Sequence, residues 1–225
     1  MRYAIGWMVM IVSLLLIGCP DSYTPERKPP AEDMPPFLWG DELFVSEDVG
    51  GGLTRTVFRT NDKQYWTYEG MTMWTVWGDG EDIFDSRTVT MGKSTGYSGG
   101  GYGIVFCHGE YEVEEKLTLA MLVVMVNNEG QYIIGKAIGG IFNDIGWWKS
   151  TPYLHRGTGA TNELTMSYEK ENGEYCLTIN GYEIERFRDD SAPALRKGKN
   201  GYIAVITPFD KFPESGIDVY YLEKM

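Results

Sequence analysis

Histidine, cysteine and basic residues are scarce in this sequence. Its 225 residues include two histidines and three cysteines, which leaves few ligands for a zinc site of familiar spacing. Twenty lysines and arginines stand against 32 aspartates and glutamates, so the formal net charge is −12. Lysine and arginine supply much of the affinity for nucleic-acid phosphates and for anionic membrane surfaces. The composition therefore argues against nucleic acid and leaves neutral ligands, cationic partners and other proteins.

Long apolar runs are also absent, except at the N-terminus. The eight-residue run Leu119–Val126 is too short to span a bilayer, which takes about 20 residues. Near the start of the chain, Arg2 is followed by a mostly apolar stretch that ends at Ile17. A short basic start, an apolar centre and small final residues indicate an export signal, and this stretch is again shorter than a membrane span.

The end of that stretch, Leu16-Ile17-Gly18-Cys19, resembles a bacterial lipobox. The resemblance implies that residues 1–18 are a lipoprotein signal peptide and that Cys19 is lipidated and becomes the first mature residue. The alternative is a general signal peptide in which Cys19 is incidental. Pro20 follows, so the aspartate that retains lipoproteins at the inner membrane of enteric bacteria is absent. We expect an exported protein that is lipid-anchored to the bacterial cell envelope, at the outer rather than the inner membrane.

Proline is concentrated in one segment. Six of the ten prolines lie between Pro20 and Pro36, interleaved with charged residues. Such a segment suits neither a regular helix nor a central strand, and it has few apolar residues to bury. Residues 19–36 therefore form the expected tether, which in polyproline geometry would reach roughly 50 Å.

From Phe37 onward no helical period is found, and short runs rich in Val, Ile, Thr, Tyr and Trp alternate with Gly, Asn and Asp. Asn180-Gly181 between two such runs is the favoured two-residue hairpin signal. Tyr175, Leu177 and Ile179 fall on one face of their strand, whereas Leu117–Val126 is apolar on both faces toward its end, as in a covered central strand. The expected strands are 53–59, 65–68, 72–77, 87–91, 102–107, 117–126, 131–138, 162–168, 174–180, 182–187, 201–206 and 217–222.

A dozen short strands fit one all-β domain over residues 37–225, a two-sheet antiparallel sandwich. Motifs in a set order from Gly101 to Glu223 carry a resemblance, among them Gly101-Tyr102-Gly103-Ile104-Val105-Phe106, Asn128-Glu129-Gly130-Gln131, Trp147-Trp148-Lys149-Ser150 and Leu177-Thr178-Ile179-Asn180-Gly181. Their order is similar to the concanavalin A-like lectin/glucanase domains, also called laminin G-like. The resemblance implies a jelly-roll fold. That superfamily holds lectins, glycosidases, adhesion modules and structural domains, so the resemblance implies a fold rather than a function.

Acidic residues offer no convincing catalytic pair. Glucanase-like members of the resembled family carry a Glu-x-Asp-x-x-Glu arrangement on one strand, and this sequence lacks it. Glu110, Glu112 and Glu114 have same-face spacing, but they border an expected turn after Gly109 and suit a solvated edge that resists edge pairing. No residue is therefore assigned a catalytic role.

Two further constellations leave alternatives open. Asp79, Asp82 and Asp85 form an oxygen-rich, Gly-containing segment that could hold calcium, or could simply be solvated. Cys107 and Cys176 could form a disulfide, which an exported protein permits, or could be two small strand residues. Cys107 could also act as a nucleophile with a distant histidine.

The tryptophans are the most suggestive feature. Trp74 and Trp77 lie three apart, and Trp147 and Trp148 are adjacent, so on regular strands the members of each pair face opposite sides. At least one of each pair could be exposed as a platform for a sugar ring or for a partner's apolar group, although sandwiches commonly bury tryptophan.

These observations support three hypotheses about function. The first is a cell-envelope lipoprotein with a non-catalytic sandwich that binds carbohydrate or another envelope or host component. The second is a glycoside hydrolase-like enzyme that uses acidic residues within 110–115 or 79–85. The third is a structural or adhesin-like lipoprotein whose ligand is a protein.

Overall fold

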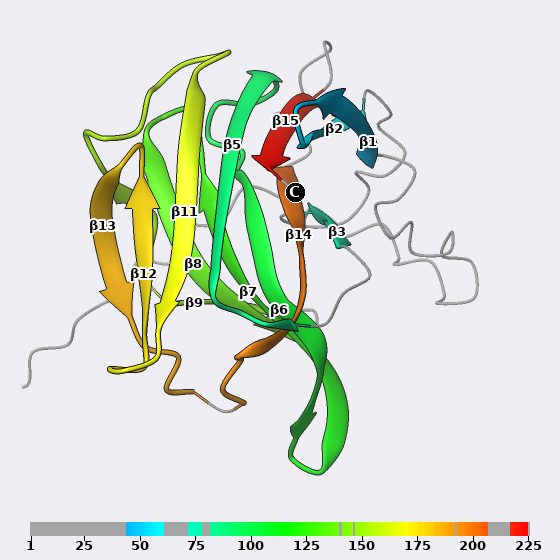
Figure 1. The fold of residues 1–225 in the computed structure, drawn as a ribbon, viewed down its shortest axis with the longest axis vertical. Helices are drawn as coiled ribbons and strands as arrows, with labels where there is room; N and C mark the ends of the chain where they lie inside the picture. Colours follow the sequence, from blue (N-terminus) through cyan, green and yellow to red (C-terminus); the bar gives the residue numbers. More distant parts are fainter. Residues whose placement is uncertain are drawn as a thin grey trace, which may run out of the picture.

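The protein, described by a computed structural model, is built from β-strands alone in the described residues (Figure 1). Those residues are 44–60, 72–77, 82–139, 141–145, 147–191, 193–206 and 217–224. The expected signal peptide, the expected lipidation site Cys19, the expected tether and the expected strand 65–68 lie outside them. In the part that is described, no helix is long and apolar enough to cross a membrane.

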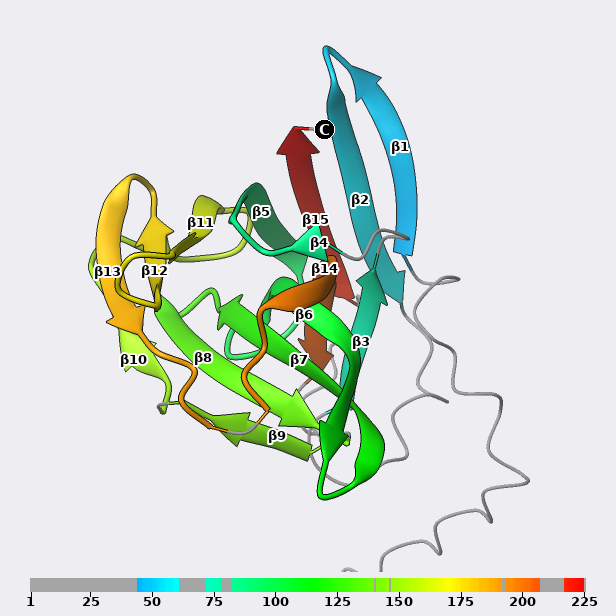
Figure 2. The same ribbon diagram turned by 60° about the horizontal axis from the view of Figure 1, so that its bottom comes forward.

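Two antiparallel sheets pack face to face. The first, sheet A, has seven strands (Figure 2). Figure 2 shows three of them, β1, β2 and β15, extending as a ribbon past the rest of the sandwich. In spatial order the strands of sheet A are β1 (Phe44–Gly50), β2 (Leu53–Thr60), β15 (Ile217–Lys224), β5 (Ser86–Thr95), β11 (Thr161–Glu169), β12 (Glu174–Ile179) and β13 (Tyr182–Phe187).

Sheet B has eight strands and contains the longest ones. Six follow in the order β10 (Lys149–Ser150), β8 (Gln131–Ile138), β7 (Lys116–Val126), β6 (Tyr102–Val113), β14 (Lys197–Ile206) and β3 (Thr72–Trp77). In addition, β9 (Ile141–Asp144) pairs with β8, and β4 (Asp82–Ile83) pairs with β14. This arrangement confirms the all-β, two-sheet antiparallel jelly-roll sandwich.

Most expected strands are present, and β3, β8 and β13 have the expected bounds. The expectation of a turn after Gly109 is wrong. Strand β6 continues to Val113 through an irregularity between Phe106 and Gly109, and the chain reverses at Glu114-Glu115 instead. A bulge adds a residue without ending the pairing, which local sequence pattern does not reveal.

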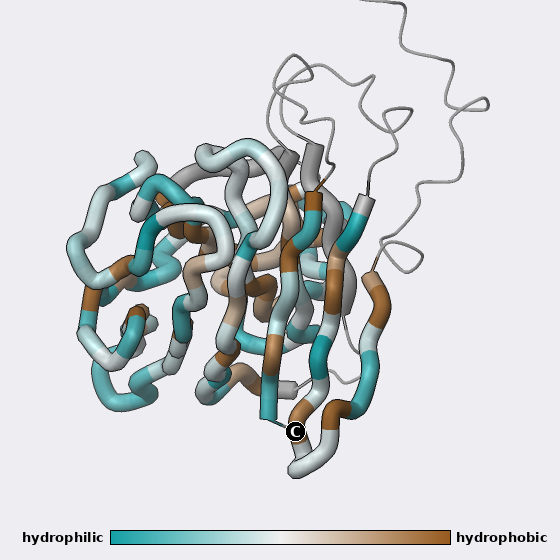
Figure 3. Tube along the Cα trace, turned by 90° about the horizontal axis from the view of Figure 1, so that it is seen from above, coloured by the Kyte–Doolittle hydropathy of each residue, from teal (hydrophilic) through white to brown (hydrophobic). Residues whose placement is uncertain are grey.

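The main core lies between the sheets. Tyr175, Leu177 and Ile179 point into it from β12, as the alternation predicts. The same alternation of hydrophobic and hydrophilic residues is visible along β15, which ends at the C-terminal mark in Figure 3. A second buried cluster lies on the side of sheet B that faces away from the main core, here named the outer face. Its members are Val105, Val123, Met125, Ile133 and Ile203, so β7 is covered on both sides as predicted.

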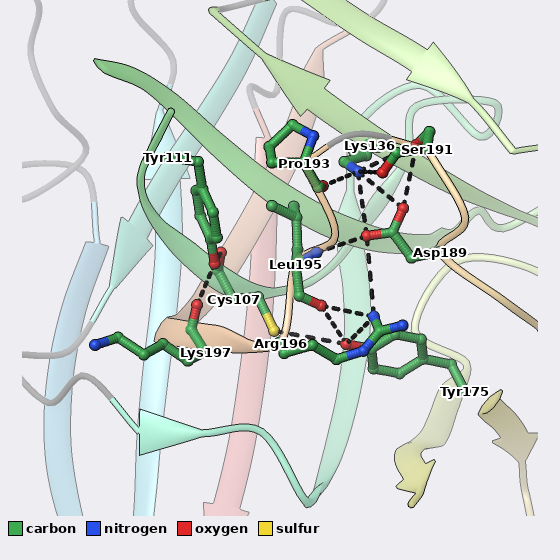
Figure 4. A network of polar contacts seen from close by, with 10 residues as sticks. All are labelled: Cys107, Tyr111, Lys136, Tyr175, Asp189, Ser191, Pro193, Leu195, Arg196 and Lys197. Atoms are coloured by element: carbon green, nitrogen blue, oxygen red, sulfur yellow. Dashed lines mark hydrogen bonds and ion pairs between the residues drawn. The ribbon is translucent and has the colours of Figure 1, made fainter. Parts of the chain in front are cut away.

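A buried ion pair fixes the crossover from sheet A to sheet B (Figure 4). Lys136 on β8 places its Nζ 2.8 and 3.1 Å from the two carboxylate oxygens of Asp189. The same ammonium donates to the carbonyls of Ser191 and Pro193. Asp189 also accepts the backbone N–H of Leu195 at 2.8 Å. The Lys136 ammonium and the Asp189 carboxylate are therefore both satisfied by contacts within the described crossover residues 188–191 and 193–196.

Removing the lysine should strongly destabilise the fold. We expect Lys136→Ala to lower the free energy of unfolding by about 3–5 kcal/mol, because it leaves the Asp189 carboxylate buried without its partner. Urea denaturation followed by tryptophan fluorescence measures the change. The matched control is Lys170→Ala, which removes an exposed ion pair with Asp85 and should cost about 1 kcal/mol or less. Equal losses for the two variants would contradict the prediction.

Candidate functional site at the loop end of the sandwich

Several loops meet at one end of the sandwich, here named the loop end. It comprises residues 96–101, 127–130 and 151–160 and the turn at 180–181. The backbone of Asn128 joins two of these loops, because its N–H donates to the Ser98 carbonyl and its carbonyl accepts from Gly157, both at 2.9 Å. Thr151 donates to the Gly130 carbonyl at 3.1 Å. The loop end is thus tied together by main-chain hydrogen bonds.

Lys93 at the end of β5 is the buried anchor of these loops. Its Nζ donates to the carbonyls of Tyr97 and Gly100 and lies 5.5 Å from the centroid of the Tyr102 ring. Its own carbonyl accepts from the Gly159 N–H at 2.9 Å. Burial lowers the pKa of Lys93 to about 7, and the negative charge of Glu129 opposes the shift.

Two asparagines order the outer part of the loop end. Asn180 has a φ of +51° in the hairpin between β12 and β13, and Gly181 follows with +82°, so the Asn-Gly turn is confirmed. The Asn180 side chain donates to the Tyr153 carbonyl at 2.7 Å and accepts the Glu163 N–H at 2.8 Å. Its amide also donates to the Asn162 side chain at 2.9 Å. These contacts attach Tyr153 to the β12–β13 turn.

Exposed aromatic rings lie on this scaffold. Tyr153 and Tyr182 are exposed and stack on each other, with ring centroids 4.2 Å apart and an angle of 19° between the planes. Close along the chain from Tyr153, Trp147 is 84% exposed. Exposed aromatic rings offer flat apolar contact surfaces with a polar edge at the tyrosine hydroxyl. The loop end therefore presents apolar ring faces beside fixed amide and carbonyl groups.

A hydrogen-bonded contact links an edge of sheet A to an edge of sheet B. The Glu185 carboxylate on β13 accepts the Tyr132 hydroxyl at 2.8 Å and the Lys149 ammonium at 2.5 Å. Burial, followed by the hydrogen bond to Glu185, raises the pKa of Tyr132 above its usual range. Because Glu185 belongs to β13 of sheet A and its two partners to β8 and β10 of sheet B, this contact joins the two sheets at their edges.

The four tryptophans expected to bind ligand differ in their surroundings. Of the adjacent pair, Trp147 is exposed, whereas Trp148 packs against the outer face, where a Cβ on Gly101 would lie 3.0 Å from its ring. The expectation that one of this pair is exposed is confirmed. Trp74 and Trp77 lie on β3 with backbones opposite Ala204 and Gly201, and their side chains lie outside the described part of the structure.

The outer face does not bring carboxylates together in a cleft. Its buried positions along β7 are Val123 and Met125, with Met121 partly buried beside them. Glu110 and Glu112 lie on the same side of sheet B, but on the part of β6 that extends beyond the neighbouring strands. Both are exposed. Within the described residues, the paired-carboxylate geometry of a glycosidase is therefore not found on this face.

The expected calcium ligands are only partly described. Asp85 is exposed and lies 3.8 Å from the Lys170 ammonium. Asp82 belongs to β4, and its side chain, like the whole of Asp79, lies outside the described residues. Among those that are described, no three His, Cys, Asp or Glu side chains group as a metal site. The calcium hypothesis thus stays a prediction.

The disulfide considered between Cys107 and Cys176 is not formed. Both cysteines are free. Cys107 points from β6 of sheet B into the main core, whereas Cys176 on β12 of sheet A alternates with core residues and faces away from the core. The thiols therefore lie on different sides of sheet A, out of bonding reach. Burial raises the pKa of Cys107 to about 11, so the thiol stays protonated and is a poor nucleophile.

Sequence reasoning missed Tyr153 and Tyr182 as site residues. A signal for Tyr182 exists, since it directly follows the Asn180-Gly181 turn and so emerges at the end of the sandwich. Tyr153 carries no such signal, because only the fold brings its loop against that turn.

No protein-family model matches the chain, and no curated protein matches it significantly. Solved structures that resemble it include the carbohydrate-binding module CBM66 from Bacillus subtilis, with 11% identity, a TM-score of 0.50, and 79% of this chain and 88% of that chain covered. A native glycosidic hydrolase has 6% identity and a TM-score of 0.52, with 81% of each chain covered. A prokaryotic β-1,3-1,4-glucanase (lichenase) from a mouse hindgut metagenome has 8% identity and a TM-score of 0.51, with 82% and 84% covered. The fold is thus that of the concanavalin A-like sandwiches.

Lys93 should make the stability of the protein depend on pH. Its pKa is about 7 when folded, against an ordinary value of 10.5, so between these values the unfolded chain binds more protons. The free energy of unfolding should therefore rise with pH above 7, and Lys93 should contribute no slope below that value. Urea denaturation of wild type and Lys93→Met across this range tests it. The same rise in the variant would show that Lys93 is not its cause.

Proposed function

We propose that this protein is a non-catalytic carbohydrate-binding lipoprotein that recognises its ligand at the loop end. The observation that carries the proposal is the stacked, exposed pair of Tyr153 and Tyr182 on a hydrogen-bonded scaffold. A pyranose ring has apolar C–H faces and a polar rim of hydroxyls. An aromatic ring suits the face, and neighbouring amides and carboxylates suit the rim.

The scaffold of the loop end favours tight recognition of a small ligand. Asn180 holds the backbone of Tyr153, and the buried Lys93 holds the loop 96–101. A site that is ordered before its ligand arrives loses less conformational entropy on binding. The exposed carboxylate of Glu163, whose backbone N–H donates to the Asn180 side chain, offers acceptors for sugar hydroxyls.

The similar structures support a carbohydrate ligand and leave two modes of action. One of them is a carbohydrate-binding module and another is a glucanase. The described part of the outer face is filled with aliphatic side chains rather than carboxylates. Because hydrolysis of a glycosidic bond takes two carboxyl groups across one site, this filling favours binding over hydrolysis.

The proposed cellular position rests on the sequence alone. Cys19 ends a lipobox-like segment, and the proline-rich residues 19–36 would hold the sandwich clear of the membrane. Pro20 in place of an aspartate supports the outer membrane of the cell envelope. This anchor would place the carbohydrate site where envelope or host glycans are met.

A glycan-array screen tests the carbohydrate site. The full chain carrying Cys19→Ser, which prevents lipidation, is applied with calcium and again with a chelator. We expect selective binding that Tyr153→Ala and Tyr182→Ala each weaken about tenfold or more. Leu117→Ala is the matched control, because it removes an exposed apolar side chain far from the loop end. Binding that survives both aromatic variants, or no binding by the folded chain, would reject the proposal.

Fractionation of cells that express the protein tests the lipid anchor. The wild type should enter the membrane fraction and incorporate labelled fatty acid, whereas Cys19→Ser should do neither, because the only proposed acceptor thiol is lost. Cys176→Ser serves as the cysteine control and should behave as wild type. Labelling that persists in Cys19→Ser would contradict the lipobox.

A further inference from the structure

The hairpin of β6 and β7 projects beyond the body of the sandwich, at the end opposite the loop end (Figure 1). Its pairing runs from Gly109 opposite Ala120 to Val113 opposite Lys116. The neighbouring strand β8 stops pairing with β7 at Ala120, and the Gly139 N–H then donates to the Leu119 carbonyl. Past that bond, no described strand covers the hairpin on the β8 side.

One face of the hairpin combines leucines with carboxylates. Glu110 lies opposite Leu119 and Glu112 opposite Leu117, and directly opposed residues of an antiparallel pair share a face. Leu117 is 73% exposed and Leu119 is 40% exposed. These four residues are here named the hairpin face. Alternation along β7 makes it continuous with the outer face through Met121.

The tip adds more negative charge. Glu114 and Glu115 form the turn and have φ values of +49° and +63°. These are left-handed conformations that glycine or asparagine adopts more easily. With Glu110 and Glu112, the hairpin carries four exposed carboxylates against the single ammonium of Lys116. Apolar surface and strong negative charge thus stand side by side.

We propose that the hairpin face is a docking surface for an extended segment of another protein in which every second residue, and so one face, is apolar or basic in turn. The exposed leucines offer apolar contact area, and the flanking carboxylates attract basic groups and select against acidic partners. The inference is independent of the carbohydrate proposal, because the two surfaces lie at opposite ends of β6.

The charge of the hairpin disfavours the other occupants. A second copy placed face to face would bring eight carboxylates of the two hairpins together, four from each. An anionic membrane surface would be repelled by the same groups, which lie directly beside the leucines. A basic and apolar protein segment is the partner that satisfies both features of the face.

Binding of a synthetic peptide with the repeat Leu-Ser-Lys-Ser, which places leucine and lysine on one face when extended, tests this inference by fluorescence anisotropy at physiological salt. The full chain with Cys19→Ser is compared with Leu117→Ser/Leu119→Ser and with Glu110→Gln/Glu112→Gln. The matched control is Val45→Ser/Glu47→Gln, which changes an exposed valine and an exposed carboxylate on β1. Peptides with the repeats Ser-Ser-Lys-Ser and Leu-Ser-Glu-Ser separate charge from apolar contact.

We expect each hairpin variant to weaken binding of the Leu-Ser-Lys-Ser peptide about tenfold or more, while the β1 control binds as wild type. The other two peptides should bind far more weakly. All substituted side chains are exposed, so circular dichroism should show unchanged folding. Equal loss in the β1 control would reduce the interaction to overall charge and overturn the proposal. Wild-type self-association that Leu117→Ser/Leu119→Ser abolishes, seen by ultracentrifugation, would overturn it in favour of a second copy.

Discussion

Lys136 and Asp189 are both charged and both buried, and the two ends of the crossover between the sheets depend on their contact. Taking two charges out of water costs several kcal/mol each, so the pair persists only because its remaining hydrogen bonds are also made. Those bonds fix Leu195, whose carbonyl accepts the Tyr175 hydroxyl at 2.6 Å. Arg196, the next residue, then lies over the Tyr175 ring at 5.0 Å. The ion pair thereby positions the crossover residues Leu195 and Arg196 against Tyr175 of the core.

Local pattern predicted the strands wherever one face or both faces are uniformly apolar. In β12, strict alternation gave the correct buried face, and in β7 continuous apolarity gave the correct central position. Strand β6 was underestimated because Cys107-His108-Gly109 interrupts its pattern, and Cys107 there adopts a φ of +55° within the irregular pairing. Strand β1 was missed because residues such as Ser46 and Asp48 give it a polar, exposed texture that is common in loops.

The candidate site was less predictable than the fold. The exposure of one tryptophan of the pair 147–148 was predictable, because adjacent residues of an extended chain point to opposite sides. The stacked tyrosines depend on a contact between a loop and a distant hairpin, and no spacing in the sequence encodes that distance. Glu185 shows the same limit. Its sequence context is an ordinary polar strand, and only the packing of two sheet edges gives it Tyr132 and Lys149 as partners.

The long strands of sheet B separate two kinds of surface. Strand β6 begins beside the ordered loop end and finishes eleven residues later in the projecting hairpin, about 35 Å away at the usual rise per residue. Rigid aromatics among amides suit a small polar ligand, whereas exposed leucines among carboxylates suit a basic protein segment. Because the separation exceeds the size of either contact, both could be occupied at once. Under the two proposals, the sandwich itself fixes the separation between a bound glycan and a bound protein segment, and the proposed tether would set only how far both lie from the membrane.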